Sequence, residues 1–210
     1  MLADDLTLYA VTDRHWLNGR TLADCVQQAL AGGATMIQLR EKHRDDAAFI
    51  QTARTLQPLC AQAHVPLIIN DNLAVAQAVA ADGLHIGQND QAAVAVRAAL
   101  QPHQLLGVSA QTVAEAVAAE AAGADYLGVG AVFATATKPD AVDVSLTTLA
   151  AITAAVSIPV VAIGGINETN LSQLAGRGIA GVALVSAIFA ATDIQAQTAA
   201  LRQQVAAVLA

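Results

Sequence analysis

Short runs of Val, Ile and Leu alternate with alanine-rich helical stretches along the whole chain, and this alternation restricts the fold more than any other feature. Strands that each precede a helix are typical of parallel sheets built from βα units. Eight such units can be counted, with candidate strands at residues 6–12, 36–40, 67–70, 83–87, 105–109, 126–130, 160–164 and 181–186. We therefore predict an α/β fold, a single (β/α)8 TIM barrel.

An open, doubly wound sheet is the alternative fold for such an alternation. It usually has fewer strands, and no G-x-G-x-x-G motif follows the first candidate strand here. The 210 residues fit one domain, 1–210, near the lower end of the usual size for a barrel. The low aromatic content, 3%, suits alanine-rich helices packed closely on buried strands.

Turn and capping residues agree with this organisation. Helix starts are expected near Asp24, Asp45, Thr112 and Ser145, because short polar side chains commonly cap helices. Glycines are expected to close the helices before the second, fourth, sixth and eighth strands, at Gly33, Gly83, Gly123 and Gly178. Each strand should be followed by a loop and a helix, and the last helix should span about 194–209.

The charge and hydropathy of the chain restrict its partners. A formal net charge of -7 argues against a nucleic-acid partner, which requires a basic surface, and favours small molecules. No apolar run approaches the roughly 20 residues of a membrane span. The first 13 residues carry acids where a secretory signal has basic residues, so we predict a cytoplasmic protein. Cys25 and Cys60 are isolated and suggest neither a disulfide nor a zinc site.

Charged residues follow the second candidate strand, at the barrel edge where active sites are built. The segment reads Gln38, Leu39, Arg40, Glu41 and Lys42. Arg40 and Lys42 are donors suited to phosphate oxygens, although a solvated turn is the alternative interpretation. An acidic protein must concentrate cations or a metal wherever it binds a phosphorylated ligand. The segment is therefore a candidate phosphate site.

Two aspartates follow neighbouring strands. Asp71 comes after the third strand within Asn70-Asp71-Asn72, and Asp90 comes after the fourth. Parallel neighbours lie about 4.8 Å apart, so both carboxylates can reach one hard cation. One Mg²⁺ ion fits best, because it retains open positions for a substrate phosphate. The alternative role for each aspartate is that of a helix cap.

A second candidate anion site involves small residues later in the chain. The loop from 131 to 144 contains Thr135, Ala136, Thr137 and Lys138 and resembles a lid, with a plain mobile loop as the alternative. The Gly164–Gly165 pair and the Val185–Ser186 pair end the seventh and eighth strands, where barrels often bind phosphate through backbone N–H groups. Two phosphorylated substrates are thus plausible partners.

Motifs for covalent catalysis are missing from the sequence. We find no G-x-S-x-G elbow, Walker loop, HExxH motif or convincing Cys/His nucleophile pair. His85 is the one histidine on a candidate strand, and a buried core histidine is the favoured interpretation over a catalytic base. The remaining histidines fall in loops or near helix ends and are assigned no role.

The chain resembles the thiamine-phosphate synthase (thiamine-phosphate pyrophosphorylase) family over nearly its whole length. Any one matching motif is common among phosphate-binding barrels, and the combination of NDN, GQND and TATK is the specific part. The motifs are LYAVTD at 8–13, QLREK at 38–42, IINDN at 68–72, GLHIGQND at 83–90, GVSA at 107–110, ADYLGVGAVFATATKPD at 124–140 and PVVAIGGI at 159–166.

The resemblance implies the joining of a hydroxymethylpyrimidine diphosphate to a thiazole monophosphate, giving thiamine monophosphate and diphosphate. It implies Mg²⁺ at Asp71 and Asp90 and catalytic roles for Lys138, Arg40 and Ser109. The pyrimidine diphosphate would be bound by Gln38, Leu39, Arg40, Glu41, Lys42, Asn70, Ser109 and Lys138. The thiazole phosphate would be bound by Thr135, Ala136, Thr137, Gly165, Val185 and Ser186.

Two other functions fit parts of this pattern. One is a thiazole tautomerase or phosphosugar-type isomerase, which needs a proton-shuttling base in the barrel mouth. Gln111 stands where relatives often have a histidine, and this departure disfavours the tautomerase. The other is a non-catalytic barrel that binds thiazole or thiamine phosphate. The sequence leaves the oligomeric state open.

Overall fold

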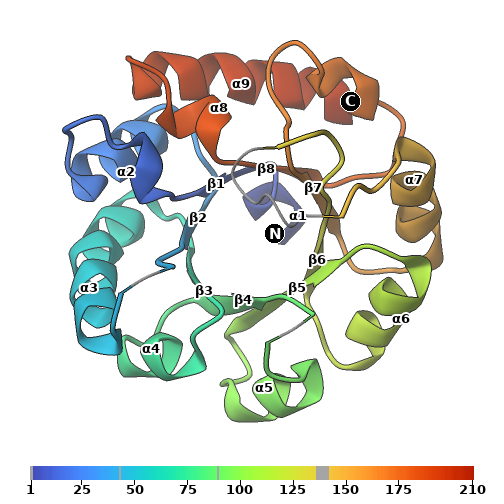
Figure 1. The fold of residues 1–210 in the computed structure, drawn as a ribbon, viewed down its shortest axis with the longest axis horizontal. Helices are drawn as coiled ribbons and strands as arrows, with labels where there is room; N and C mark the ends of the chain where they lie inside the picture. Colours follow the sequence, from blue (N-terminus) through green and yellow to red (C-terminus); the bar gives the residue numbers. More distant parts are fainter. Residues whose placement is uncertain (1, 43, 89, 136–141) are drawn as a thin grey trace.

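A computed structural model describes residues 2–42, 44–88, 90–135 and 142–210. Eight parallel strands close into one barrel in the order β1 to β8, as predicted, with helices around the outside (Figure 1). Each strand is one to three residues shorter than expected, except β3, which has the expected bounds, and β5, which is one residue longer. They are β1 (Leu8–Val11), β2 (Met36–Leu39), β3 (Leu67–Asn70), β4 (Gly83–Ile86), β5 (Leu105–Ala110), β6 (Tyr126–Val129), β7 (Val160–Ile163) and β8 (Gly181–Leu184).

Each strand pairs with the next one in the sequence, and β8 closes the ring by pairing with β1, with Tyr9 opposite Ala183. Alternate side chains therefore point outward, toward the helices, and inward, toward the barrel axis. The outward side chains form the large apolar core with the helices. Because all strands are parallel, their C-terminal ends meet at a single mouth.

Helices cover the outer face of the barrel (Figure 1). Asp45, Thr112 and Ser145 are N-caps, as expected, whereas Thr21 caps the helix that contains Asp24. The predicted last helix is confirmed. The helices are α2 (Leu22–Ala31), α3 (Asp46–Ala63), α4 (Leu73–Ala78), α5 (Ala93–Ala99), α6 (Val113–Ala121), α7 (Leu146–Ala155) and α9 (Ile194–Leu209).

The prediction of a helix after every strand is wrong between β7 and β8. The structure has a short 3-10 helix there, η2 (Leu171–Leu174), and Gly178 follows it with a positive φ of 73°. Side-chain hydrogen bonds of Asn167 and Asn170 fold the preceding residues into turns. Such local bonds compete with helix formation, which explains the difference.

The assignment of Gly83 as a helix-closing residue is also wrong, because Gly83 begins β4. Ala80 takes the left-handed conformation after α4, with φ 47°. Gly83 is needed for close packing instead, since a Cβ atom there would lie 2.4 Å from the carbonyl oxygen of Leu105. A strand glycine of this kind permits close backbone approach.

A short N-terminal helix, α1 (Leu2–Asp5), occupies residues just before β1 and lies within the ring of strands in Figure 1. Leu6 is fully buried in the barrel interior, and Leu2 packs against the same cluster. These side chains close the end of the barrel opposite the mouth. Among the described residues, no helix combines the length and apolar character needed to cross a membrane.

Candidate active site

A cavity of about 380 Å³ opens at the mouth of the barrel, and side chains from all eight strands reach it. This volume suits a small-molecule ligand. The cavity brings together residues that are far apart in the sequence. The predicted site residues that line it are Gln38, Arg40, Lys42, Asn70, Asp71, Asp90, Ser109, Thr135, Gly165, Val185 and Ser186.

Two predicted site residues lie elsewhere. The side chain of Leu39 is fully buried between the sheet and the helices, on the outward face of β2. Glu41 accepts hydrogen bonds from Arg14 at 2.6, 2.8 and 2.9 Å, and its side chain is only 2% exposed. This pairing fixes the loop after β2. The predicted residues Ala136, Thr137 and Lys138 lie outside the described residues.

Asp71 and Asp90 lie close together at the ends of β3 and β4. Burial, followed by the neighbouring carboxyl group of Asp90, raises the pKa of Asp71 to about 6. Two carboxylates brought this close repel each other when both are ionised. A divalent cation between them would remove that repulsion, so the pair fits a Mg²⁺ site.

The backbone holds both aspartates in place without using either as a helix cap. Asp71 has a positive φ of 62°, and its N–H donates to the carbonyl oxygen of His85 at 2.8 Å. Asn72 is the residue that caps α4. Asp90 Oδ2 accepts from the N–H of Gly87 at 2.7 Å, and α5 begins later, at Ala93. The alternative interpretation of both aspartates as helix caps is therefore wrong.

Arg40 and Lys42 bring positive charge to the same side of the cavity. The backbone N–H of Arg40 donates to Thr12 Oγ1 at 3.1 Å, and its guanidinium pairs with Asp13 at 3.1 Å. These contacts hold the arginine at the ends of β1 and β2. Lys42 is exposed at the rim. Together, the two cations offset the local charge of the aspartates and can bind phosphate oxygens.

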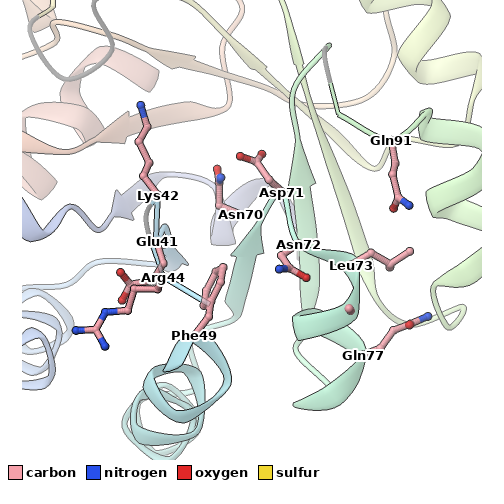
Figure 2. Close-up of a pocket in the computed structure, with 11 residues that line it drawn as sticks. Glu41, Lys42, Arg44, Phe49, Asn70, Asp71, Asn72, Leu73, Gln77 and Gln91 are labelled. Carbon is pink, nitrogen blue, oxygen red and sulfur yellow. The ribbon is translucent and has the colours of Figure 1, made fainter. Parts of the chain in front are cut away.

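An open groove of about 570 Å³ extends outward from this half of the cavity, between α3 and α4. Figure 2 shows Lys42, Asn70 and Asp71 along its upper edge and Phe49 below them. These three polar residues line both the groove and the central cavity. The charged half of the site is thus open toward solvent on the side of α3 and α4.

The opposite half of the cavity is built mainly from backbone. Gly164 and Gly165 have positive φ values of 99° and 66°, and a Cβ atom on Gly165 would lie 2.4 Å from the carbonyl oxygen of Ala134. Val185 precedes a short helix, α8 (Ser186–Phe189), whose first N–H groups have no acceptor within the helix. Such groups commonly bind phosphate after strands seven and eight of a barrel.

The ends of the predicted lid are held together. The N–H of Ala131 donates to the carbonyl oxygen of Val142 at 3.1 Å, and Val144 donates back to Ala131 at 2.8 Å. Phe133 donates to Gly164 at 3.0 Å, which extends the pairing of β6 with β7. This pairing brings Thr135 to the cavity wall, on the same side as Gly165.

Sequence reasoning missed the floor of the cavity. Tyr9 and Tyr126 are fully buried inside the barrel, and their hydroxyl groups lie 2.9 Å apart. His85, predicted to be a core residue, is buried beside them. Both tyrosines occur on candidate strands, and their position on the inward face was the signal that could have revealed them.

The closed ring of parallel strands, with one cavity at its mouth, defines a single-domain (β/α)8 barrel. The family description "Thiamine monophosphate synthase" matches residues 8–188, and the chain belongs to that family.

Individual relatives agree with this assignment. A thiamine-phosphate synthase of Ruminiclostridium cellulolyticum is 50% identical over 191 residues, which cover 91% of each chain. One from Lacticaseibacillus paracasei is 46% identical over 209 residues, covering 100% of this chain and 98% of the relative. A solved structure of a thiamine phosphate pyrophosphorylase from Pyrococcus furiosus is 37% identical, covers 100% of both chains and has a TM-score of 0.92.

Proposed function

We propose that this protein joins 4-amino-2-methyl-5-hydroxymethylpyrimidine diphosphate to 4-methyl-5-(2-phosphoethyl)thiazole, giving thiamine monophosphate and diphosphate. The observation that carries the proposal is the pairing, in one cavity, of a charged half at β2 to β4 with a neutral backbone half at β7 and β8. The charged half suits a leaving diphosphate, and the neutral half suits a phosphate that takes no part in the reaction. Membership of the family supports the same assignment.

The reaction needs one bond to break and one to form. The bond between the pyrimidine methylene carbon and the diphosphate oxygen breaks, and its electron pair leaves with the diphosphate. The 4-amino group of the pyrimidine stabilises the resulting cation, and the thiazole nitrogen then attacks with its free lone pair. No proton has to be removed, which is consistent with Gln111, a residue that cannot act as a base, lining the cavity.

The residues of the chain contribute by binding and orienting the two substrates. Arg40 and Lys42 neutralise the departing diphosphate, and Asn70 and Ser109 orient the pyrimidine portion. The family resemblance adds Lys138 to the cations. Gly165, Val185 and Ser186 hold the thiazole phosphate, together with Thr135. The resemblance further adds Ala136 and Thr137.

Asp71 and Asp90 would hold one Mg²⁺ ion, with its remaining positions available to diphosphate oxygens and water. When bound, the ion supplies Lewis-acid stabilisation of the negative charge that develops on the leaving group. The raised pKa of Asp71 supports this assignment, because burial and the neighbouring Asp90 both oppose its ionisation, and a bound cation would favour it.

The test is a two-substrate assay that measures thiamine monophosphate with Mg²⁺ and with a chelator. We expect product only when both substrates and the metal are present. Folded protein that forms no thiamine monophosphate under these conditions would refute the proposal. Conversion of the thiazole monophosphate alone, without release of diphosphate, would indicate a tautomerase instead. We also propose a cytoplasmic location.

A further inference from the structure

Five polar side chains form one continuous hydrogen-bonded chain across the floor of the cavity. Gln38 Nε2 donates to the Tyr9 hydroxyl at 2.7 Å, and this hydroxyl lies 2.9 Å from that of Tyr126. The Tyr126 hydroxyl lies 3.1 Å from His85 Nδ1, and His85 Nε2 lies 3.0 Å from Ser109 Oγ. We call these five residues the floor relay.

The direction of each hydrogen bond follows from the number of protons available. Both tyrosines stay neutral, because burial raises their pKa values well above the ordinary range for tyrosine, so each has one hydroxyl proton. Tyr9 accepts from Gln38, so it must donate its proton to Tyr126 to avoid a buried, unpaired O–H group. Tyr126 must then donate to His85 Nδ1 for the same reason.

The proton count also determines the state of His85 and Ser109. His85 Nδ1 accepts from Tyr126, so the neutral imidazole has its proton on Nε2 and donates it to Ser109 Oγ. The Ser109 hydroxyl proton is then available to a ligand in the cavity. At the other end, the bond from Nε2 to Tyr9 fixes which way the Gln38 amide is turned, so its Oε1 can act as an acceptor for a ligand in the cavity.

We propose that Tyr9 and Tyr126, acting through His85, are positioning residues that make Gln38 an acceptor and Ser109 a donor toward the bound pyrimidine. This inference rests on the proposed function. A 4-aminopyrimidine matches this polarity, because its amino group donates and its ring nitrogens accept. A 4-oxopyrimidine would place a carbonyl oxygen against Gln38 Oε1. The floor relay therefore selects the amino form of the substrate.

The surrounding glycines leave the space that this arrangement requires. A Cβ atom on Gly107 would lie 2.3 Å from the Tyr126 hydroxyl and 2.4 Å from His85 Nδ1. On Gly128 it would lie 3.0 Å from Cε1 of His85. Any larger residue at position 107 would thus separate two members of the floor relay. Tyr9 and Tyr126 also meet edge to face, with centroids 6.0 Å apart, which fixes the hydroxyl groups.

The first test needs neither substrate nor turnover. Nitrogen-15 NMR of the histidine side chains reports the imidazole tautomer, and a His85→Gln variant assigns the signal. We expect neutral His85 with its proton on Nε2 in the wild-type protein. A proton on Nδ1 would reverse every hydrogen bond of the floor relay and overturn the inference. This result is independent of whether the protein makes thiamine monophosphate.

The second test compares amino and oxo forms of the pyrimidine diphosphate by calorimetric binding with Mg²⁺. The wild-type protein should prefer the amino form by roughly 100-fold or more. Tyr9→Phe should reduce that preference about tenfold, since Gln38 can then turn its amide either way. Thr198→Val is the matched control, because it removes a buried hydroxyl on α9 that donates to the carbonyl oxygen of Ile194.

The two tests distinguish the positioning role of the tyrosines from the proposed synthase reaction. An unchanged preference in Tyr9→Phe and Tyr126→Phe would overturn the positioning role, as would an equal loss in Thr198→Val. If the Tyr9 variant does not fold, the tautomer of the wild-type protein still decides the direction of the bonds. A preserved preference for the amino form without product formation would support the floor relay and refute the proposed synthase reaction.

Discussion

Strands β2 to β4 meet the cavity with charged side chains, whereas β7 and β8 meet it with backbone groups and small residues. The charged half depends on the identity of each side chain, and burial together with the neighbouring Asp90 raises the pKa of Asp71 there. The neutral half depends on the conformation of the backbone, because its donors are N–H groups that any sequence with this backbone conformation would provide. The two halves should therefore respond differently to substitution.

The largest effect is expected in the charged half. Asp71→Asn and Asp90→Asn should each lower kcat/KM at least about 100-fold, because the metal would lose a charged ligand. Titration of activity with Mg²⁺ measures the change. Asp24→Asn is the control for net charge, since Asp24 is exposed on α2. If Asp71→Asn and Asp90→Asn both kept full activity at ordinary magnesium concentrations, the charged half would not depend on the identity of these two side chains.

In the neutral half, adding a single methyl group should be enough to weaken the binding of the thiazole phosphate. Gly165→Ala should raise the KM for the thiazole phosphate by roughly 10- to 100-fold, because a Cβ atom there would meet the carbonyl oxygens of Phe133 and Ala134 at 2.6 and 2.4 Å. The KM for the pyrimidine diphosphate should change little. Steady-state kinetics with each substrate varied in turn will measure both constants.

Gly176→Ala provides the matched control for backbone strain. Gly176 has a φ of 70°, close to the 66° of Gly165, but a Cβ atom there would meet nothing within 4 Å. It should therefore show the cost of the left-handed conformation without obstruction of the site. Equal KM values for the thiazole phosphate in Gly165→Ala and Gly176→Ala would mean that the close contacts at Gly165 do not affect binding of this substrate.

Arg20 stabilises α8, the short helix that carries part of the neutral half. Its guanidinium donates to the carbonyl oxygens of Phe189 at 3.0 Å and Ala191 at 2.8 Å, at the C-terminal end of α8. Arg20→Met should lower the free energy of unfolding by about 2 kcal/mol and raise the thiazole phosphate KM by only about threefold. Denaturant titration and kinetics will measure the two effects. Arg54→Met, an exposed position on α3, should change neither.

The smallest effect concerns the stability of the metal-free protein. The pKa of Asp71 is raised from 3.8 to about 6, so its ionisation opposes folding above about pH 6, and this cost disappears as the pH falls toward 3.8. Asp71→Asn should thus stabilise metal-free protein at about pH 7.5 by no more than about 1 kcal/mol, because solvent screens the partly exposed side chain. Urea titration in chelator should show this gain shrink at lower pH.

Much of this architecture could be predicted from the sequence, because the barrel follows from local patterns. Hydrophobic runs locate the eight strands, and the parallel arrangement then places Asp71, Asp90 and Gly165 at one mouth. The helix expected before β8 is absent because Asn167 and Asn170 form turns. The helix was expected from the βα alternation, which does not take account of side-chain hydrogen bonds that stabilise turns.

Individual side-chain partners were harder to predict. Glu41 lies between two cations in the sequence, but it pairs with Arg14, which is 27 positions away. Leu39 belongs to the same charged segment, but the alternation of strand side chains turns it outward. The contact between Tyr9 and Tyr126 joins residues 117 positions apart, so it depends on barrel closure. Such pairs appear only once the register of the strands is known.

The buried position of Tyr9 and Tyr126 has a practical consequence for spectroscopy. They are the only two tyrosines of the chain, and both line the cavity. Every tyrosine absorbance, fluorescence or isotope-edited signal of the protein therefore originates at the site itself. The single tryptophan, Trp16, lies in the short 3-10 helix after β1 and can be followed separately. Ligand binding can thus be recorded optically in the unmodified protein, without attaching a probe.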